Sequence, residues 1–563
     1  MKKRVISLSI MLALFPVLGH AQAPVPLISQ PLSPGTAVPG GPPLTLIVHG
    51  TGFVASSVVQ WNGMPLATQY VSGSELVAAV PAANVAKAGS AQVQVVNPAP
   101  GGGTSNAITF EISEPVPVST FNRVDYSKGY GYPSVVAADF NGDGKLDVAA
   151  VSLGSYFVSV YLGDGHGGFA HKGDYATGSG NDNDSLVVGD FNGDGKLDLA
   201  VRGVSVMLGN GDGSFQPPVS YAAGNNALAT GDFNGDGILD LASTDPSGVV
   251  FIQMGNGDGS FQDPVPVNAG SNPYPIAVGD FNGDGIPDLA VGLQVDAGGV
   301  VILVGNGDGT FQAPVAYPSL PNPVDIFAAD MNGDGVLDLV VTSYSAEEVS
   351  VFLGKGDGTF LPRRDYEVGV PTFRGGVADL NGDGNQDVVV TPWYNDTNFY
   401  VLRGHGDGSL GKPTAYPTGS CPLGTAFGDF NDDGVMDVVV AEQCGAISVF
   451  LGSIIALQPE SLDFGKVTVG QQATLATQLT NVRVRAASIN NIKVEGGQGA
   501  FSETNNCGNN LAGGGSCTVT VVFAPAGSGS FGARVVIPMD APGTPQSVYL
   551  SGSGTTKMAS EKK

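Results

Sequence analysis

The sequence predicts an all-β protein whose largest part is a β-propeller, and three observations lead to this prediction. The 563 residues include 84 glycines and 38 prolines but only 13% charged residues, which is typical of short strands joined by many turns. The nonapeptide DFNGDGKLD, first found at residues 139–147, occurs in seven similar copies. The copies begin 42 to 51 residues apart, and periods of this length with four strands each are typical of propeller blades.

Residues 1–21 are predicted to be a secretory signal. A KKR start precedes an apolar run, and Gly19-His20-Ala21 is a small-x-small cleavage site, with cleavage after Ala23 as the alternative. No Cys follows the apolar run, which argues against a lipoprotein, and the polar, disordered tail 555–563 carries no hydrophobic anchor. We therefore expect a secreted or cell-envelope protein without membrane insertion, in a compartment where disulfides persist.

Residues 24–113 are predicted to form a small all-β domain, because short alternating strands are separated by Gly, Asn and Pro turns. The domain resembles the IPT/TIG immunoglobulin-like family through Gly50-Thr51-Gly52-Phe53, Trp61-Asn62-Gly63, Val80-Pro81-Ala82, Asn97-Pro98 and Gly102-Gly103-Thr104-Ser105-Asn106. This resemblance implies a β-sandwich in which the glycines and Trp61 are structural. The next residues, EPVPV at 114–118, are expected to be an extended and fairly stiff linker.

Residues 119–453 are predicted to form a closed ring of seven four-stranded blades. One period, from Ala227, runs ALATGDF, the loop, ILDLAST, the hairpin DPSG, VVFIQMG, NGDGSF and QDPVPVNA. Each sheet has two faces to bury, and stacking against its neighbours buries them. The segment 121–126 matches the strands that end other blades yet precedes the first loop, and the seventh copy stops at Gly452 without such a strand. We expect the first strand to complete the last blade, so that no sheet edge stays open.

Each nonapeptide has the pattern of a calcium-binding loop. In the first copy Asp139, Asn141 and Asp143 supply side-chain oxygens at positions 1, 3 and 5, Lys145 offers its carbonyl at position 7, and Asp147 completes the set. Three carboxylates this close together repel one another, and a hard divalent cation with six to eight oxygen ligands removes that repulsion. The copies contain no His or Cys, which disfavours zinc and copper, and magnesium seldom occupies an all-protein cage.

Two alternative interpretations of the nonapeptide fit less well. An EF-hand needs a bidentate Glu at position 12, where the first two copies have Ala150 and Val201, and the flanking segments alternate like strands. A hairpin turn without metal explains one copy, but it does not explain three Asp at fixed offsets in all seven. Calcium is therefore the predicted cofactor.

The predicted calcium ligands are the residues at positions 1, 3, 5, 7 and 9 of each copy. In chain order they are Asp139, Asn141, Asp143, Lys145, Asp147, Asp190, Asn192, Asp194, Lys196, Asp198, Asp232, Asn234, Asp236, Ile238, Asp240, Asp280, Asn282, Asp284, Ile286, Asp288, Asp330, Asn332, Asp334, Val336, Asp338, Asp379, Asn381, Asp383, Asn385, Asp387, Asp429, Asn431, Asp433, Val435 and Asp437.

The seven copies resemble FG-GAP/VCBS repeats, the units of integrin α-subunit propellers. The resemblance covers about 60% of the chain and rests on the acidic nonapeptide. It implies calcium-bearing loops between β-strands, and it implies no particular ligand for the protein as a whole.

The order of strands sorts the loops of the ring onto two faces. Both the calcium loops and the GNGDGS-type turns between the third and fourth strands belong to one face, so the opposite face carries the variable loops, where function is usually placed. We expect its aromatic side chains to contact sugars or a protein partner, with ordinary loop packing as the alternative. Trp393, Tyr394, Tyr344 and Tyr274 are the candidate ligand-binding residues, and Tyr130, Tyr132, Tyr156 and Phe373 belong to the same predicted face.

Residues 454–554 form the third predicted domain. The segments LQPESLDFGKVTVGQQATLATQLTNV and FSETNNCGNNLAGGGSCTVTVVFAPAG resemble the immunoglobulin-like family of Hydin-type and bacterial choice-of-anchor modules, which are mostly spacers. Cys507 and Cys517 flank a glycine-rich turn and are predicted to form a disulfide. In the ring, Cys421 and Cys444 fall on the same face and are predicted to form a second one, since an exported protein favours a bridge over a reactive thiol.

The composition excludes several classes of function. The net charge is -27, and 22 of the 51 acidic residues lie in the seven loops, so a large part of the acidity is a ligand set. No basic stripe exists for nucleic acid. There is no G-x-S-x-G, H-E-x-x-H or phosphate-binding motif. We expect a seven-bladed β-propeller flanked by two immunoglobulin-like β-sandwich domains that acts as a non-catalytic binding or adhesion protein. Its partner would be a surface protein or a glycan. A carbohydrate-binding lectin is the alternative, followed by a secreted hydrolase with its acids on the variable face.

Overall fold

The computed structural model describes residues 23–28, 32–87, 89–99, 101–112, 120–127, 131–152, 155–178, 185–392, 396–418, 421–432, 435–443, 445–453, 455–459, 461–481, 486–539 and 546–556. The predicted signal and linker lie outside these residues. In the described residues the secondary structure is β-strand apart from two short 3-10 helices, η1 (Ala82–Val85) and η2 (Gly497–Gly499). The all-β prediction is confirmed.

The N-terminal unit consists of two sheets around one core. One sheet has the order β1-β3-β7-β6 and the other β2-β10-β8-β4-β5, with β9 paired to β8. Trp61 is 5% exposed and its ring centroid lies 4.9 Å from that of Phe110, so it is a core residue, as predicted. The strands are β1 (Leu27–Ile28), β2 (Thr36–Ala37), β3 (Leu44–Thr51), β4 (Val58–Trp61), β5 (Met64–Pro65), β6 (Ala67–Ser72), β7 (Glu75–Val80), β8 (Gly89–Asn97), β9 (Gly103–Thr104) and β10 (Ile108–Ile112). Membership of the IPT/TIG family stays a prediction.

The described residues of the repeat region form seven antiparallel four-stranded sheets. The first six are β12 (Ser134–Ala138), β13 (Asp147–Val151), β14 (Phe157–Gly163) and β15 (Phe169–Ala176); β16 (Leu186–Gly189), β17 (Asp198–Val201), β18 (Ser205–Met207) and β19 (Val219–Ser220); β20 (Leu228–Gly231), β21 (Asp240–Asp245), β22 (Val249–Gln253) and β23 (Val265–Asn268); β24 (Pro273–Gly279), β25 (Asp288–Leu293), β26 (Val300–Leu303) and β27 (Val315–Tyr317); β28 (Pro323–Ala329), β29 (Asp338–Ser343), β30 (Glu348–Phe352) and β31 (Arg364–Glu367); β32 (Thr372–Ala378), β33 (Asp387–Pro392), β34 (Asn398–Leu402) and β35 (Thr414–Pro417). The seventh is β36 (Pro422–Gly428), β37 (Asp437–Glu442), β38 (Ala446–Ser453) and β11 (Thr120–Ser127).

These sheets stand in a ring. Their first strands contact one another in the cycle β12, β16, β20, β24, β28, β32 and β36, and β36 contacts β12 again. The last sheet has the order β11-β38-β37-β36, so a strand from the start of the region is its outermost member. β11 pairs antiparallel with β38, with Phe121 opposite Gly452 and Tyr126 opposite Ile447. The prediction that the first strand completes the last blade is confirmed.

The core of the ring lies between neighbouring sheets. One cluster combines Ala149 and Val151 of β13 with Leu199 of β17 and Phe215, which follows the third strand of the next sheet. The second strands are the most deeply buried, since all five residues of β13 and all six of β29, β33 and β37 are buried. Because both faces of these strands are covered, their sequences are runs of Val, Ala and Leu rather than alternating patterns.

The C-terminal unit has a short two-stranded sheet, β42-β45, and two four-stranded sheets around one core. Their orders are β39-β41-β46-β44 and β40-β48-β47-β43, and Phe523, Val519 and Leu479 are fully buried between them. The strands are β39 (Ile455–Gln458), β40 (Ser461–Thr468), β41 (Ala473–Asn481), β42 (Ala487–Ser488), β43 (Lys493–Gly496), β44 (Phe501–Asn505), β45 (Asn510–Leu511), β46 (Ser516–Phe523), β47 (Gly529–Ile537) and β48 (Gln546–Thr555).

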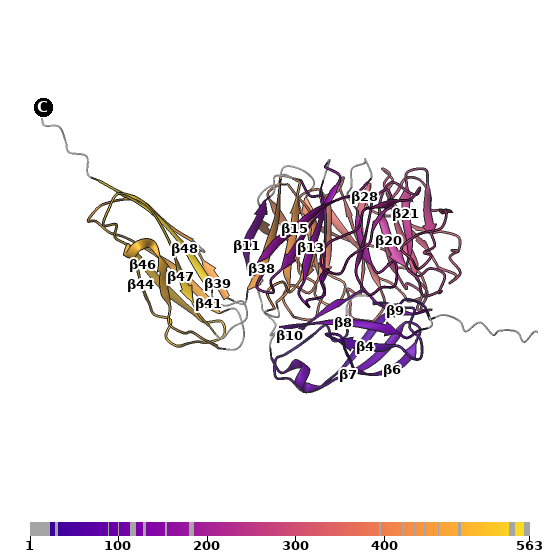
Figure 1. The fold of residues 1–563 in the computed structure, drawn as a ribbon, viewed down its shortest axis with the longest axis horizontal. Coiled ribbons are helices and arrows are strands. Elements are labelled where there is room, and N and C mark those ends of the chain that lie inside the picture. The colour runs from indigo at the N-terminus through magenta and orange to yellow at the C-terminus, as the bar shows by residue number, and fades with distance from the viewer. Residues whose placement is uncertain are drawn as a thin grey trace, which may run out of the picture.

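Figure 1 shows how the three units are arranged. The N-terminal unit, with β4, β6, β7 and β8, lies against one end of the ring, and the C-terminal unit, with β39, β41 and β46, extends from the side where β11 and β38 lie. Hydrogen bonds join the N-terminal unit to the ring, for example from the Val25 amide to Asp232 Oδ2 at 2.9 Å. Among the described residues no helix has the length and apolar character needed to cross a membrane.

Closure of the ring depends on the β11 side chains that face the core. Phe121 is 8% exposed and contacts the rings of Phe399, Tyr416 and Phe450, whereas Val124 on the same strand is 39% exposed. We expect Phe121→Ala to lower the free energy of unfolding by about 3–5 kcal/mol, because it leaves a cavity at the closing pair. Val124→Ala is the matched control and should cost about 0.5 kcal/mol or less. Urea denaturation followed by circular dichroism measures both, and equal losses would contradict the role given to Phe121.

Candidate functional site

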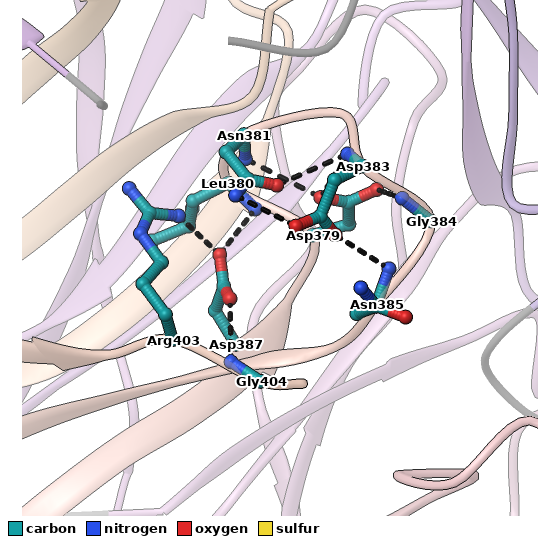
Figure 2. A network of polar contacts seen from close by, with 9 residues as sticks. All are labelled: Asp379, Leu380, Asn381, Asp383, Gly384, Asn385, Asp387, Arg403 and Gly404. Carbon is teal, nitrogen blue, oxygen red and sulfur yellow. Dashed lines mark hydrogen bonds and ion pairs between the residues drawn. The ribbon is translucent and has the colours of Figure 1, made fainter. Parts of the chain in front are cut away.

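Each candidate loop lies between the first and second strands of its sheet, as the strand order predicts. In the sixth sheet the loop 379–387 leads from β32 to β33 (Figure 2). Gly382 and Gly384, at positions 4 and 6, have φ values of 67° and 87°. Only glycine adopts this left-handed conformation without strain, so the pattern N-G-D-G lets the chain turn tightly enough to bring positions 1, 3 and 5 together.

The aspartate at position 1 organises the loop backbone. Asp379 Oδ2 accepts a hydrogen bond from the Gly384 amide at 2.7 Å, and Oδ1 accepts bonds from the Asn381 and Asp383 amides at 3.3 and 3.2 Å (Figure 2). In the first loop, Asp139 accepts bonds from the amides of positions 3 to 6 at 2.7–3.3 Å. These donors neutralise part of the carboxylate charge and hold its oxygens inside the turn.

The side chains at positions 3 and 5 complete this turn. Asn381 Oδ1 accepts a bond from the Asp383 amide at 3.0 Å, and its Nδ2 donates to Asp383 Oδ2 at 3.0 Å. Asp383 Oδ1 accepts a bond from the Asn385 amide at 2.8 Å. The structure therefore brings together the predicted ligands at positions 1, 3 and 5, and each still has oxygen lone pairs beyond those it uses here.

The aspartate at position 9 has a different environment. Asp387 is fully buried, its Oδ2 accepts a bond from the Leu380 amide at 3.1 Å, and its Oδ1 accepts one from the Gly404 amide at 2.9 Å. Arg403 also donates to this carboxylate (Figure 2). The same two amide bonds recur at the fully buried Asp147, Asp198, Asp240, Asp288, Asp338 and Asp437. We call these seven residues the clamp aspartates.

The clamp aspartates tie three parts of a sheet together. One oxygen holds the residue after position 1, and the other holds a glycine just before the turn between the third and fourth strands. Burial raises the pKa of Asp147 to about 6 and that of Asp240 to about 8, against the effect of the amide donors. Position 9 was predicted from the sequence only as a ligand, and its role in joining the strands was not predicted. The signal was available, because a glycine precedes the N-G-D-G-type turn in each of the first six blades.

Six of the loops are also joined to the next sheet of the ring by a backbone hydrogen bond. The Gly213 amide donates to the Phe140 carbonyl oxygen at 3.0 Å, so the third-to-fourth-strand turn of one sheet binds the loop of the sheet before it. The Gly167 amide and the Phe430 carbonyl repeat this bond at 3.0 Å between the first and the seventh sheets. The ring of Phe140 packs against that of Phe215 with 5.7 Å between centroids. Position 2 of the motif, which the sequence analysis did not single out, is thus a contact between blades.

The donor set of the loops fits calcium. In the described part of the chain no group of three or more Asp, Glu, His or Cys side chains converges as a metal cage. The clamp aspartate of each loop is turned to backbone amides, which leaves two carboxylates, one carboxamide oxygen and the carbonyl at position 7. Hard oxygen donors of this kind, completed by water, suit calcium. Coordination by position 9 stays a prediction, and Asp433 of the seventh loop lies outside the described residues.

The candidate aromatic residues do not form one group. Tyr274 lines a cavity of about 80 Å³ on the axis of the ring together with Asp325 and Arg374, and Tyr344 is half-buried. Tyr156 is 44% exposed, as expected for the variable face. Tyr132 contradicts the expectation, because it is fully buried where the first and last sheets meet and its hydroxyl lies 3.2 Å from Ser159 Oγ. Phe373 is half-buried, and the other candidates, Tyr130, Trp393 and Tyr394, lie outside the described residues.

The predicted disulfides are partly tested. Cys507 and Cys517 are bonded with an S–S distance of 2.09 Å, which confirms that pair. Cys421 is disulfide-bonded, and its predicted partner, Cys444, lies outside the described residues. No described cysteine is free.

Comparison with known families agrees with the loop geometry. The FG-GAP-like repeat family matches residues 139–201, 232–291, 287–341, 330–378 and 379–440. Five FG-GAP-like repeats are therefore found in the ring. The HYDIN/CFA65/VesB-like Ig-like domain family matches residues 453–554, which cover the C-terminal unit. Of the three resemblances predicted from the sequence, those to FG-GAP repeats and to the Hydin-type family are confirmed at this level. None of the curated proteins matches the chain.

Several solved structures resemble the chain at low identity. An auxiliary nutrient binding protein from Bacteroides ovatus is 12% identical, over 76% of this chain and 98% of its own, with a TM-score of 0.33. The periplasmic gluconolactonase of Pseudomonas aeruginosa is 16% identical, over 59% of this chain and 93% of its own, with a TM-score of 0.42. PapD-like domain 7 of human CEP192 is 16% identical, over 18% of this chain and 87% of its own, with a TM-score of 0.14. At such values these likenesses carry no argument about ligand or activity.

The clamp and ligand roles of the FG-GAP-like loops can be separated by mutation. Asp240→Ala leaves two buried amides, those of Phe233 and Gly255, without acceptors. We expect it to lower the free energy of unfolding in chelator by about 3 kcal/mol or more, since each buried unsatisfied group costs about 1–3 kcal/mol. Asp236→Ala, in the same loop, is the control and should cost less than about 1.5 kcal/mol. Equal losses of stability for the two variants, measured by denaturant titration in chelator, would contradict the assignment of Asp240 as a clamp residue and Asp236 as a ligand.

Proposed function

We propose that this chain is an exported, calcium-binding FG-GAP-like propeller protein that binds a surface partner and catalyses no reaction. The observation that carries the calcium assignment is the turn itself. In loop after loop an aspartate at position 1 holds the amides of positions 4 to 6, and a second aspartate at position 5 lies in the same turn. The two carboxylates repel each other, and a divalent cation offsets that repulsion.

Calcium has a structural role in this proposal. The loop positions its oxygens only when the sheet is folded, so the ion stabilises the folded state by mass action. Extracellular calcium modules bind with dissociation constants of about 0.1–1 mM, which suits a compartment where free calcium is high. The disulfide between Cys507 and Cys517 is in keeping with such a compartment.

The binding role belongs to the face opposite the calcium loops. That face carries the hairpins between second and third strands, which differ from blade to blade in length and sequence. Two of its tyrosines, Tyr156 and Tyr344, belong to these hairpins, and the first is 44% exposed. A rigid ring with variable loops at one end is a common platform for recognition, and aromatic side chains on it contact either proteins or sugar rings.

The calcium assignment is tested by stoichiometry. Asp280→Ala combined with Asp284→Ala removes both acidic ligands of the fourth loop that lie in its turn. We expect calorimetry on the protein without residues 1–21 to show one bound calcium fewer than wild type, and a smaller rise of the melting temperature on adding calcium. Asp308→Ala is the control, because Asp308 binds Thr310 in a turn outside the predicted ligand set. An unchanged stoichiometry in the double variant would falsify the assignment.

The binding role is tested with a panel of glycans and extracellular proteins on the same protein. We expect specific binding that weakens about tenfold, or about 1.4 kcal/mol, in the double variant Tyr156→Ala, Tyr344→Ala. Tyr549→Ala is the control, since Tyr549 is 66% exposed but belongs to the C-terminal unit. Binding that free sugar abolishes would identify a lectin. Turnover of any panel member, lost when acids of the variable face are replaced, would instead identify an enzyme.

A further inference from the structure

The N-terminal unit rests on four of the seven loops. The Val25 amide donates to Asp232 Oδ2 of the third loop at 2.9 Å. In the fourth loop the carbonyl oxygen of Gly285 accepts a bond from the Gly52 amide at 2.8 Å, and that of Gly283 accepts one from Ser74 Oγ at 3.4 Å. Figure 1 shows this unit, around β9 and β8, lying along one end of the ring.

The fifth and sixth loops meet the same unit. Thr36 Oγ1 donates to the Gly382 carbonyl oxygen of the sixth loop at 3.5 Å. A Cβ atom at Gly335 of the fifth loop would lie 3.2 Å from His49 Nε2, so the imidazole packs directly on that loop. The unit thus contacts backbone atoms of positions 4 and 6, which flank the predicted calcium ligands, and in the third loop it contacts the position 1 ligand Asp232 itself. We call loops three to six the covered loops.

The covered loops lack the positively charged side chain that the first two loops have at position 7. Position 7 is Lys145 in the first loop and Lys196 in the second, and Lys196 Nζ lies 3.1 Å from Asp194 Oδ2. In the covered loops position 7 is uncharged, with the residues Ile238, Ile286, Val336 and Asn385. In the sixth loop Arg403 pairs with the clamp Asp387, away from positions 1 and 5.

The N-terminal unit brings almost no positive charge to this face. Lys87 is the only Lys or Arg in residues 24–113, which also contain Glu75 and Glu111. The four covered loops contain twelve aspartates, and Asp232, Asp280 and Asp379 at position 1 are at most 9% exposed. Burying carboxylates beneath a domain with a single Lys or Arg is electrostatically unfavourable unless another source of positive charge is present.

We propose that calcium ions in the covered loops hold the N-terminal unit on the propeller, so that the unit docks when these loops are loaded and leaves when they are emptied. The inference rests on the proposed calcium function. The ion removes the repulsion at the interface, and it fixes the loop backbone whose carbonyl oxygens at positions 4 and 6 accept the bonds from the unit. The first, second and seventh loops bind calcium without this consequence.

Docking and calcium binding then reinforce each other. Whatever calcium adds to the affinity of the unit for the ring, docking adds to the affinity of the covered loops for calcium, because the coupling free energy is the same in both directions. The covered loops should therefore bind calcium more tightly than the other three, by roughly 5- to 150-fold if the coupling is typical. Calorimetry of the intact chain would show two classes of site.

Hydrogen exchange measured by mass spectrometry on the full chain tests the inference. The amides of Val25 and Gly52, which bond to the covered loops, report docking. We expect their exchange to be at least tenfold slower in calcium than in chelator, while the sandwich core at Val93 stays protected in both. Equal exchange in calcium and chelator, with calorimetry showing bound calcium, would overturn the inference and leave the proposed function standing. No bound calcium in folded protein would overturn both.

A steric variant separates docking from folding. A Cβ atom at Gly73 would lie 3.6 Å from the Asp284 carbonyl oxygen, so Gly73→Trp fills the space that the fourth loop occupies. It should undock the unit even in calcium, with seven ions still bound but the difference between the two classes of site abolished. Val71→Trp, at a 47% exposed position near it, is the control and should behave as wild type. A Gly73→Trp variant that kept slow exchange at Gly52 would contradict the inference.

Single-loop variants give a second control. Asp280→Ala and Asp190→Ala should each remove one calcium ion, from a covered loop and from the second loop respectively. Asp190 accepts bonds from Asp194 and Gly195 of its own loop. Only Asp280→Ala should speed exchange at Gly52, and the inference fails if both variants or neither do so.

Discussion

A fully buried aspartate that accepts two backbone amides is the interaction on which the ring depends. In the first blade Asp147 holds the amide of Phe140 on one side and that of Gly163 on the other. The acidic loop, the second strand and the end of the third strand are thereby joined at one point. The Phe140 carbonyl in turn accepts a bond from the Gly213 amide of the next blade. The position of the loop therefore constrains the position of the neighbouring blade.

The sequence was sufficient for the broad architecture because the blade is a repeat. Seven copies showed which residues occupy equivalent positions, and the strand-like segment at Phe121 had no partner in its own period, which implied the closing pair. The role of Asp147 was not predictable from the nonapeptide alone, because calcium and a pair of amides both select a carboxylate. Tyr132 was misassigned for a related reason. It is buried between the first and last blades, a contact that no single period contains.

The contact between the N-terminal unit and the ring was harder to predict from the sequence. The loop atoms that accept its bonds at Gly283, Gly285 and Gly382 are carbonyl oxygens, which every residue has, so no residue type marks the interface. The available signal was the absence of lysine at position 7 in the four covered loops, whereas two of the other three loops have it. The missing lysines become informative only once the N-terminal unit, which covers these loops, is known to carry almost no positive charge.

The pairing of β11 with β38 constrains how the protein is made. Thr120 lies opposite Ser453, so more than 300 residues separate partners that must meet in one sheet. During synthesis β11 is made long before its partner β38. Its peptide groups therefore lack their sheet partners until the last blade has been translated. Such distant pairing slows assembly and exposes an edge in the nascent chain. Completion of the ring is therefore a late event in biogenesis, and a chain truncated before residue 446 would leave that strand without its sheet.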